Sequence, residues 1–408
     1  MTRSTGTPDI DTVAAFLDAG HVELAKSVSA FATEKIEPLE TVDDDAQARV
    51  QAREILEMLG AGGWCRYAVP ADFGGFSDRV DTVACCLIRE ALAAASPLAD
   101  SVFALQCLGA LPIALYGNEE IQRHWLPKVA DGSAMAGFAM TEVNAGSDVR
   151  AMTTRAERND GNDGDDGDDG DDGHEGGYTI NGSKTFITNA GLADFYTTFA
   201  RTSEDGLSTF VVPGGARGVR FVGAQILSAP HPLGEIAFEA CRVPSSARLG
   251  QEGDGFEIGM TTLDRLRPTV AAAACGMAAR AFDEAKQHAM NRRQFGRQLS
   301  RFQLTQQKMA RMATDLAASR LLTFRAARAS IDGETGVTLR SAMSKYHATE
   351  MAQRVVDDAV QILGGIGVLK KHPVDHLYRA VRALRIYEGT SEIQQLVIAR
   401  EIFRDSGP

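Results

Sequence analysis

The sequence predicts a mainly α-helical protein with a central β domain: an N-terminal helical domain, a middle antiparallel β barrel or sheet, and a C-terminal four-helix bundle. Apolar residues recur at helical spacing in the first and last parts of the chain, whereas the middle part contains short β-branched and aromatic runs between turn residues. A chain of 408 residues is long enough for two or three domains. We therefore expect domains at 1–134, 135–248 and 249–408.

The N-terminal domain is predicted from three stretches of helical periodicity between Asp11 and about Ala130. These read VAAFLDAGHVELAKSVSAFATEKIEPLE, VDTVACCLIREALAAA and LPIALYGNEEIQRHWLPKVADG. Gly and Pro residues interrupt the pattern between them, as in AVPADFGG at 68–75. This part of the chain is therefore expected to be all helical.

The middle domain begins near Met135, where the runs GFAMTE, GGYTINGSKTFIT, DFYTTFART, STFVVP, VRFVGA and IAFEACRVP predict strands. An Asp/Gly tract at 159–173 lies between two of them and contains eight Asp and no basic residue. Such a composition cannot form a core, so we expect a disordered hairpin loop. The alternative, calcium binding, lacks the closing Glu and the hydrophobic frame of an EF-hand loop.

The C-terminal domain shows helical periodicity in long segments that end at glycines. Gly333 and Gly336 separate two of the segments, and GGIG at 364–367 ends another. Long helices joined by short breaks are typical of an antiparallel bundle. The expected helices span about 256–291, 299–331 and 338–363, with a shorter one after Pro373.

Composition excludes several classes of protein. Eight of the negative charges behind the net charge of −12 lie in the Asp/Gly tract. The sequence shows no cluster of basic residues of the kind typical of a nucleic-acid binder. We expect no membrane-spanning run and no signal or transit peptide. The six cysteines show no metal-ligand spacing, so we expect reduced thiols, no metal site and a cytoplasmic protein.

Four motifs in this order resemble the acyl-CoA dehydrogenase family: FAMTEVNAGSD at 138–148, NGSKTFITNAG at 181–191, QILGGIG at 361–367 and YEGTSEIQ at 387–394. The resemblance implies non-covalent FAD, a homotetramer and α,β-dehydrogenation of an acyl thioester to the trans-2-enoyl product. It also implies electron transfer to an electron-transferring flavoprotein, and a fatty-acid metabolic role. The absence of GxGxxG after a strand argues against a Rossmann site.

Glu388 matches the catalytic base of the family, which removes the α-proton while hydride passes to flavin N5. Its apolar neighbours Ile386 and Tyr387 should raise its pKa, although an ordinary loop carboxylate remains the alternative from the residues alone. Leu266 matches the position where other members carry the base, and leucine cannot accept a proton. Arg267 matches an arginine that lies near the carboxylate and the thioester.

The resemblance assigns further residues to cofactor and substrate. Thr141 would meet the pyrimidine edge of the flavin, Thr188 would bind near N5, and Phe186 would cover a ring face. Gly389 lets ligand approach the backbone closely, and Ser147 matches a contact to the pantetheine–phosphate part of the carrier. The full cofactor set is Phe138, Met140, Thr141, Phe186, Thr188, Arg292, Gln294, Phe295, Gln303, Gln361, Gly365, Thr390 and Glu392, and the substrate set is Ser147, Tyr387, Gly389 and Asp264.

Other functions remain open at this point. One alternative is another flavoenzyme of the same fold. An acyl-CoA oxidase differs mainly in how oxygen reaches reduced flavin, whereas a flavin monooxygenase tends to lack the carboxylate, so Glu388 argues against it. A dehydrogenase of acyl carrier protein thioesters would differ in the carrier. A catalytically silent subunit is the non-enzymatic alternative, and Glu388, Thr188 and Arg292 argue against it.

Overall fold

The computed structural model describes residues 9–159 and 177–404, and the chain divides into two compact units. The helical unit combines Met1–Asp43, Asp81–Ala104 and Leu263–Pro408, and the sheet unit combines Asp44–Val80 and Leu105–Thr262. Each unit is thus assembled from segments far apart in sequence. The boundaries expected near residues 135 and 249 stay a prediction, and the Asp/Gly tract, apart from Asn159, lies outside the described residues.

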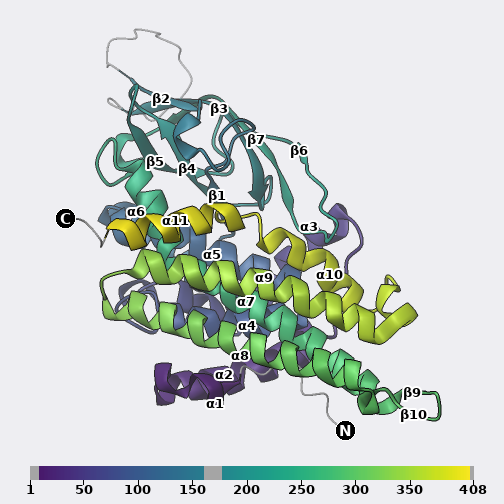
Figure 1. Ribbon diagram of the computed structural model, residues 1–408. Helices are drawn as coiled ribbons and strands as arrows, with labels where there is room; N and C mark the ends of the chain where they lie inside the picture. The colour runs from purple at the N-terminus through teal and green to yellow at the C-terminus, as the bar shows by residue number, and fades with distance from the viewer. Residues whose placement is uncertain (1–8, 160–176, 405–408) are drawn as a thin grey trace. The chain divides into compact units, whose positions relative to one another are not determined.

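The helical unit is dominated by long helices, of which α8 and α9 pack along each other (Figure 1). Both α10 and α11 pack on α9, and α4 packs against α2 and α8. The helices predicted in the last part of the chain are confirmed to within a few residues. The elements here are α1 (Ile10–Val13), α2 (Ala19–Phe31), α4 (Thr82–Ala95), α8 (Gln303–Asp332), α9 (Val337–Leu363), α10 (Pro373–Leu384), α11 (Ser391–Arg404), and the 263–291 part of α7 (Gly255–Asn291).

The ends of these helices follow from local chemistry. Gly333 terminates α8 with a φ of 66°, and Gly336 precedes α9 with a φ of 77°, both conformations that glycine adopts without steric cost. Helix α10 starts with Pro373, whose fixed φ suits the first turn. The preceding His372 ring accepts a hydrogen bond from Val374 N at 3.2 Å.

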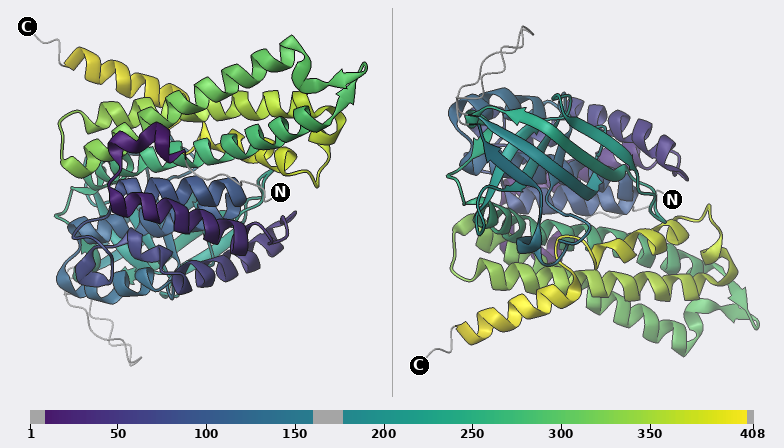
Figure 2. Two further views of the ribbon diagram at one scale, coloured as in Figure 1. Left: turned by 90° about the horizontal axis from the view of Figure 1, so that it is seen from below. Right: turned by 90° about the horizontal axis from the view of Figure 1, so that it is seen from above.

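The sheet unit contains one eight-stranded sheet, whose strands lie alongside one another in Figure 2. The strand order is β6-β7-β3-β2-β4-β5-β8, and β1 pairs with β4. The strands are β1 (Ala136–Ala139), β2 (Arg155–Arg158), β3 (Tyr178–Thr188), β4 (Phe195–Arg201), β5 (Leu207–Pro213), β6 (Val219–Ala224), β7 (Leu233–Val243) and β8 (Arg248–Leu249).

The predicted β domain is confirmed, with one difference in strand direction. Most neighbours are antiparallel, but β1 runs parallel to β4, and β2 also meets β4 in parallel at Arg155 and Arg201. The sheet is therefore mixed rather than wholly antiparallel. Strands β2 and β3 flank the Asp/Gly tract and pair antiparallel, with Arg158 opposite Tyr178. That pairing is the one expected of strands joined as a hairpin.

Helices α3 (Asp45–Ala61), α6 (Glu119–Ala130) and part of α5 (Pro97–Tyr116) complete the sheet unit. Helix α5 is long and apolar enough to cross a membrane by length and composition, contrary to the expectation that no such run exists. However, 83% of its most apolar window is buried within the protein, as is usual for a core helix. The six cysteine side chains are buried.

Candidate active site

Glu388 lies on the short turn between α10 and α11, and its backbone adopts a left-handed conformation. Its φ is 54°, and that of the following Gly389 is 88°. This conformation costs a residue with a Cβ atom roughly 1–2 kcal/mol, whereas glycine adopts it freely. Because such a conformation persists only where its surroundings hold it, the contacts of this turn decide how the carboxylate is presented.

Three side chains donate hydrogen bonds to the two carbonyl groups of this turn. The Gln394 amide reaches Glu388 O at 3.2 Å and Gly389 O at 3.1 Å. The Lys345 Nζ atom reaches Gly389 O at 2.7 Å, and Arg267 Nε reaches Glu388 O at 3.4 Å. These donors come from α11, α9 and α7, so three helices fix one turn.

The carboxyl group of Glu388 is less completely bonded than its backbone. Its Oε2 atom is buried and has no hydrogen-bond partner among the described residues. Burial raises the pKa of Glu388, and the positive charges of Arg89, Lys345 and Arg267 oppose that rise. A carboxyl group with a raised pKa and a free oxygen is suited to accept a proton near neutral pH.

Arg267 is itself held in place by a neighbour on the same helix. Its guanidinium pairs with Asp264 Oδ1, and Thr338 Oγ1 donates to Asp264 Oδ2 at 2.6 Å. Burial lowers the pKa of Arg267, while Asp264 and Glu388 favour its charged form. The structure thus brings Arg267 and Asp264 together beside the turn of Glu388, and their roles toward a substrate stay a prediction. Leu266 is buried, in keeping with a packing role.

A second ion pair close to Glu388 was not predicted from the sequence. Arg89 on α4 donates to Asp100 Oδ1 at 2.7 Å and Oδ2 at 2.9 Å, and to Thr269 Oγ1 at 2.8 Å. Burial alone would lower the pKa of Arg89, but Asp100 outweighs burial and the pKa is raised. The signal was available, because Arg89 and Glu90 are the charged residues in the otherwise apolar run VACCLIREALAAA.

Lys345 was also missed, although its position in α9 is informative. Ala342, Ala348 and Ala352 lie three and seven residues away on the same helix face, and all are fully buried. A lysine in the middle of such an apolar stripe needs a specific polar partner. Its ammonium group finds one in Gly389 O.

In the sheet unit, the segment that follows β1 carries three of the predicted flavin contacts. Phe138 packs on Phe199 with ring centroids 5.0 Å apart, and Met140 is buried in the same cluster. The main-chain oxygen of Thr141 accepts a hydrogen bond from Thr185 N at 2.9 Å. The Thr141 hydroxyl makes no hydrogen bond within the described residues and is half-buried, so it is able to serve a ligand.

A buried ion pair holds this segment against β3. Lys184 Nζ donates to Glu142 Oε1 at 2.8 Å and to Met140 O at 3.2 Å, on either side of Thr141. Glu142 also accepts three hydrogen bonds from Thr153 and Thr154, at 2.6 to 3.0 Å. Attraction by Lys184 and these bonds outweigh burial and lower the pKa of Glu142 to about 2.

Thr188 and Phe186 lie near the end of β3. The Thr188 hydroxyl is 3.5 Å from the His231 ring, and Phe186 N donates to Gln225 Oε1 at 2.8 Å. Phe186 has a φ of 55° and its ring is 61% exposed. Burial lowers the pKa of His231 to about 4, so that ring is neutral near pH 7.

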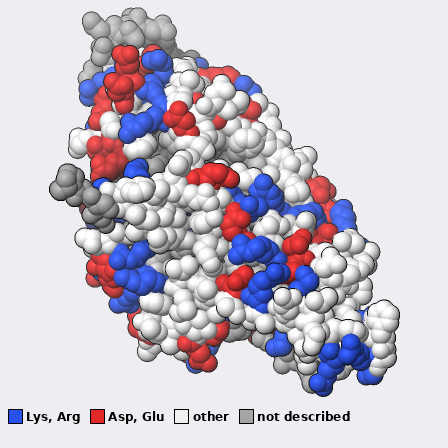
Figure 3. All heavy atoms as spheres, viewed as in Figure 1, with Lys and Arg blue, Asp and Glu red and all other residues white. Residues whose placement is uncertain are grey.

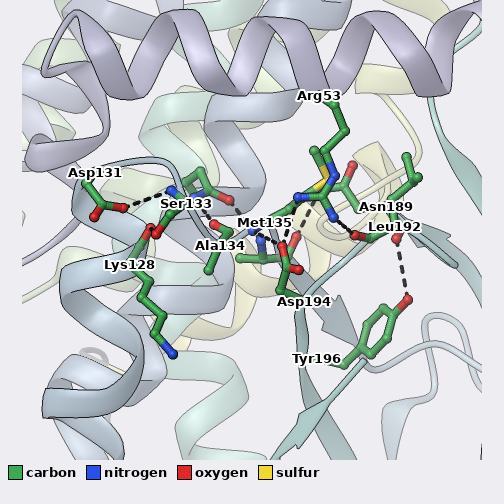
Figure 4. Close-up of polar contacts among 12 residues, drawn as sticks. Arg53, Lys128, Asp131, Ser133, Ala134, Met135, Asn189, Leu192, Asp194 and Tyr196 are labelled. Carbon is green, nitrogen blue, oxygen red and sulfur yellow. Dashed lines mark hydrogen bonds and ion pairs between the residues drawn. The ribbon is translucent and has the colours of Figure 1, made fainter. Parts of the chain in front are cut away.

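The turn after Thr188 is fixed by polar contacts (Figure 4). Arg53 on α3 donates to Asp194 Oδ2 at 2.9 Å and to Leu192 O, and Asp194 Oδ2 also accepts from Met135 N at 2.7 Å. The Tyr196 hydroxyl accepts from Gly191 N at 2.8 Å. The start of β4, the start of β1 and α3 are therefore joined through the Asp194 carboxylate.

The remaining predicted cofactor residues lie at the far ends of the long helices. Arg292 and Gln294 lie at the end of α7 in the hairpin of β9 (Arg293–Gln294) and β10 (Arg297–Gln298), where Phe295 is 93% exposed. Lys and Arg side chains gather over this hairpin in Figure 3. About 24 residues of helix, or about 36 Å, separate Arg267 from this end of α7. Within one copy of the chain, the hairpin is therefore too far along α7 to contact Glu388.

Other assigned residues are accessible, and each is on a loop or helix end. Gln303 begins α8, Gln361 and Gly365 lie at the end of α9, and all three are exposed. Thr390 accepts a hydrogen bond from Ile393 N at 3.3 Å, and Glu392 lies in the first turn of α11. Ser147 is exposed on the loop after β1, and Tyr387 is 36% exposed. Within the described residues, no group of three His, Cys, Asp or Glu side chains could hold a metal.

Comparison with known proteins matches all three parts of the chain to one family. The N-terminal, middle and C-terminal domains of acyl-CoA dehydrogenase match residues 18–133, 137–241 and 253–403. The probable acyl-CoA dehydrogenase fadE25 of Mycobacterium leprae is 36% identical over 390 residues, which are 94% of this chain and 95% of that protein.

Solved structures agree with the sequence match. A chain in the structure of the electron transferring flavoprotein of Acidaminococcus fermentans superimposes with a TM-score of 0.87 and 32% identity, over 95% of this chain and 99% of that chain. An acyl-CoA dehydrogenase of Bacillus anthracis, solved with FAD, gives 0.85 and 27% identity over 97% of this chain and 69% of that chain. These matches confirm the resemblance that the four sequence motifs indicated.

Proposed function

The chain belongs to the acyl-CoA dehydrogenase family, and from this premise we propose that it removes hydrogen from Cα and Cβ of an acyl-CoA thioester, giving the trans-2-enoyl thioester. It is an oxidoreductase, and FAD is its cofactor, as in the solved Bacillus anthracis relative. When bound, FAD supplies the acceptor for the hydride from Cβ. The protein supplies binding, orientation and a base for the α-proton.

The observation that carries this proposal is the state of the Glu388 carboxyl group. Its Oε2 atom is buried without a partner among the described residues, its pKa is raised by burial, and its turn is held by three donors. A C–H bond next to a thioester is a weak acid, so a desolvated and fixed carboxylate is the group needed to remove the proton. Glu388 is therefore the proposed catalytic base.

Other residues of the helical unit are proposed to act on the thioester. Arg267 places a buried positive charge beside the turn of Glu388, and Asp264 holds that charge in position. Gly389 follows Glu388 in the turn and the partly exposed Tyr387 precedes it, and both are proposed to contact the thioester. Ser147 in the sheet unit is exposed and is proposed to contact the pantetheine–phosphate part of the carrier.

The residues present fit FAD in their chemistry. The free hydroxyl of Thr141 and that of Thr188 suit the polar edges of a flavin, and the exposed ring of Phe186 suits its face. Phe138 and Met140 pack behind Thr141. The basic hairpin suits a pyrophosphate, for which arginine is well adapted. The residues proposed for the phosphates and adenosine are Arg292, Gln294, Phe295, Gln303, Gln361, Gly365, Thr390 and Glu392.

The separation of the hairpin from Glu388 along α7 supports an oligomer in which the hairpin serves a second copy of the chain. We propose a homotetramer on the family pattern. An electron-transferring flavoprotein is the proposed electron acceptor, in keeping with the match to a chain in the Acidaminococcus fermentans structure. Buried thiols are compatible with the action in the cytoplasm that we propose.

The test is a panel of short, branched, long and aryl acyl-CoA thioesters added to the purified protein under nitrogen. We expect yellow protein whose flavin, released by heat and identified as FAD, is bleached by at least one thioester. Bleaching only by acyl carrier protein thioesters would show that the thioester carrier is acyl carrier protein rather than coenzyme A. Rapid reoxidation of the reduced flavin by oxygen would indicate an oxidase. Colourless protein that takes up no FAD would contradict the proposal.

A further inference from the structure

Among the described residues, Lys345 is the one cation acting on Glu388 that forms no ion pair with a carboxylate within 4 Å. Its side chain is fully buried, and its Nζ atom donates to the main-chain oxygen of Gly389 at 2.7 Å. No ion pair of Lys345 within 4 Å is found in the part of the chain that the structure describes. By contrast, Arg267 pairs with Asp264, and Arg89 pairs with Asp100.

A buried ammonium group bound to a neutral carbonyl is an expensive arrangement. Desolvation of a charge is compensated only when an opposite charge or several hydrogen bonds replace the lost water. Burial accordingly lowers the pKa of Lys345 to about 8, and the attraction of Glu388 is the largest effect that opposes this. A leucine or methionine would fill the same space at less cost, so a role in packing alone does not account for a lysine here.

The atom that Lys345 binds explains why a lysine is present at this position. Gly389 O directly follows the left-handed Glu388, so a bond at this oxygen resists rotation of the turn back to ordinary backbone geometry. The Gln394 amide binds the same oxygen at 3.1 Å, but it carries no charge. Lys345 differs from Gln394 in adding a positive charge that favours the ionised form of Glu388.

We propose that Lys345 is a positioning residue for Glu388, which fixes the turn through Gly389 O and favours the ionised carboxylate through a positive charge that forms no ion pair within 4 Å among the described residues. This inference rests on the proposed function, in which Glu388 takes the proton. A base must be ionised before it acts, so a nearby cation increases the fraction of protein that is ready to react.

The charged groups that face Glu388 come from several helices, and together with Lys345 they determine the pKa of its carboxyl group. The cations Arg89 and Arg267 are each matched by an aspartate, Asp100 and Asp264, on their own or a neighbouring helix. Lys345 also lies in the field of Glu350 and Glu392, and Glu350 is engaged by Arg385 at 2.7 Å. Removing the charge of Lys345 should therefore move the titration of Glu388 to higher pH.

The experiment compares Lys345→Met, Lys345→Arg and Gln394→Met with wild type by anaerobic stopped-flow bleaching of the flavin over a range of pH. We expect Lys345→Met to retain FAD and thioester affinity, to lose between about tenfold and a hundredfold in rate, and to reach its full rate only at higher pH. Lys345→Arg should keep the wild-type pH profile. Gln394→Met should slow the reaction without moving the profile.

Infrared titration of the Glu388 carboxyl band gives a readout that does not depend on turnover. The band is assigned by its absence in Glu388→Gln, and it should titrate at higher pH in Lys345→Met than in wild type. Lys26→Met on the exposed face of α2 is the matched control. If Lys345→Met does not fold, Lys345→Gln carries the same expectation.

An unchanged titration of Glu388, or a bleaching rate in Lys345→Met within twofold of wild type, would overturn this inference. Failure of wild-type protein to bleach with any thioester would instead contradict the proposed function, and the infrared titration would still decide whether Lys345 controls the carboxyl group. The two failures are therefore distinguishable.

Discussion

Lys184 in the sheet unit and Lys345 in the helical unit are both fully buried, and burial lowers the pKa of each ammonium group to about 8. Their partners differ. Lys184 binds the Glu142 carboxylate at 2.8 Å, and that carboxylate is further saturated by Thr153 and Thr154. Among the described residues, Lys345 binds the main-chain oxygen of Gly389 alone, and the attraction of Glu388 is the largest effect that favours its charged form.

The two lysines therefore have different roles. Lys184 belongs to a stabilising ion pair, whereas the charge of Lys345 acts on the candidate active site. The Lys184–Glu142 pair is neutral as a whole, and it fixes the chain on both sides of Thr141. Lys345 lacks its own counter-charge, so its field acts on the nearest functional carboxylate. Similar burial and similar pKa values can therefore accompany different roles, and the partner rather than the burial identifies which role a lysine has.

The largest effect on stability is expected from Glu142→Leu, which leaves the Lys184 ammonium group buried without its carboxylate. Breaking a buried pair in this way typically costs about 3–5 kcal/mol of unfolding free energy. Urea unfolding followed by tryptophan fluorescence reports on this unit, since Trp64 and Trp125 both belong to it.

Two variants serve as controls for that measurement. The double variant Glu142→Leu/Lys184→Met removes the stranded charge and should recover much of the loss. Lys345→Met in the helical unit strands no carboxylate within hydrogen-bond distance and should cost less than Glu142→Leu. A loss below about 1 kcal/mol in Glu142→Leu would mean that the pair is not a main support of the sheet unit.

Acid should weaken the same ion pair next. The pKa of Glu142 is lowered from its ordinary 4.5 to about 2, mainly because the Lys184 charge and hydrogen bonds outweigh burial. A carboxyl group whose folded-state pKa is depressed contributes stability that is complete above about pH 4.5 and is lost as pH falls toward 2. We expect up to about 3 kcal/mol of stability to disappear over this range in wild type.

The measurement is the unfolding free energy as a function of pH for wild type and for Glu142→Leu/Lys184→Met. The double variant lacks the titrating carboxylate, so its curve should be flatter between pH 4.5 and 2. Parallel curves for the two proteins would show that other carboxyl groups cause the acid sensitivity.

A smaller effect is expected from Gly389→Ala, which tests how tightly the turn of Glu388 is held. A Cβ atom here would lie 2.4 Å from Gln394 Nε2, and the φ of 88° disfavours any side chain. We expect about 1–2 kcal/mol of lost stability together with slower flavin bleaching.

Gly333→Ala is the matched control for that substitution. Its φ is 66°, and a Cβ atom there would meet nothing within 4 Å. It should lose stability through backbone strain but bleach at the wild-type rate. Equal bleaching rates in the two variants would mean that the turn tolerates movement without loss of function.

The smallest effect is expected from deleting Asp160–Gly173 between β2 and β3. The tract carries no apolar residue that could join a core, and shortening the loop changes its closure free energy by only about 1 kcal/mol, in favour of the folded state. Activity, FAD content and urea unfolding should stay close to wild type. A large loss of activity would indicate that the tract binds a metal or supports the fold.

Periodicity predicted the long helices well, because a helix reveals itself within its own sequence. The helix expected at 256–291 is found at Gly255–Asn291, and the one expected at 338–363 at Val337–Leu363. The parallel pairing of β1 with β4 was not predictable in the same way. Strand partners are chosen by tertiary packing, and strands such as β4 that are buried on both faces show little alternation.

The site was predictable where its residues lie in contiguous motifs. Glu388 and Arg267 were assigned through the family resemblance, and the structure brings both to one turn. Lys345 and Arg89 escaped because each acts through a residue far away in the chain, 44 residues in the case of Lys345 and Gly389. The left-handed φ of Glu388 also has no local signature, since it results from donors on three helices.

The most direct test of the central claim, that Glu388 removes the α-proton, is the bleaching rate of Glu388→Gln under nitrogen with a thioester that bleaches wild type. The amide keeps the shape of the side chain but cannot accept the proton, while Glu23→Gln on exposed α2 is the control. We predict retained FAD and thioester binding, with a rate lower by about 10²–10⁴-fold or more. A rate within about tenfold of wild type would contradict the assignment of Glu388 as the base.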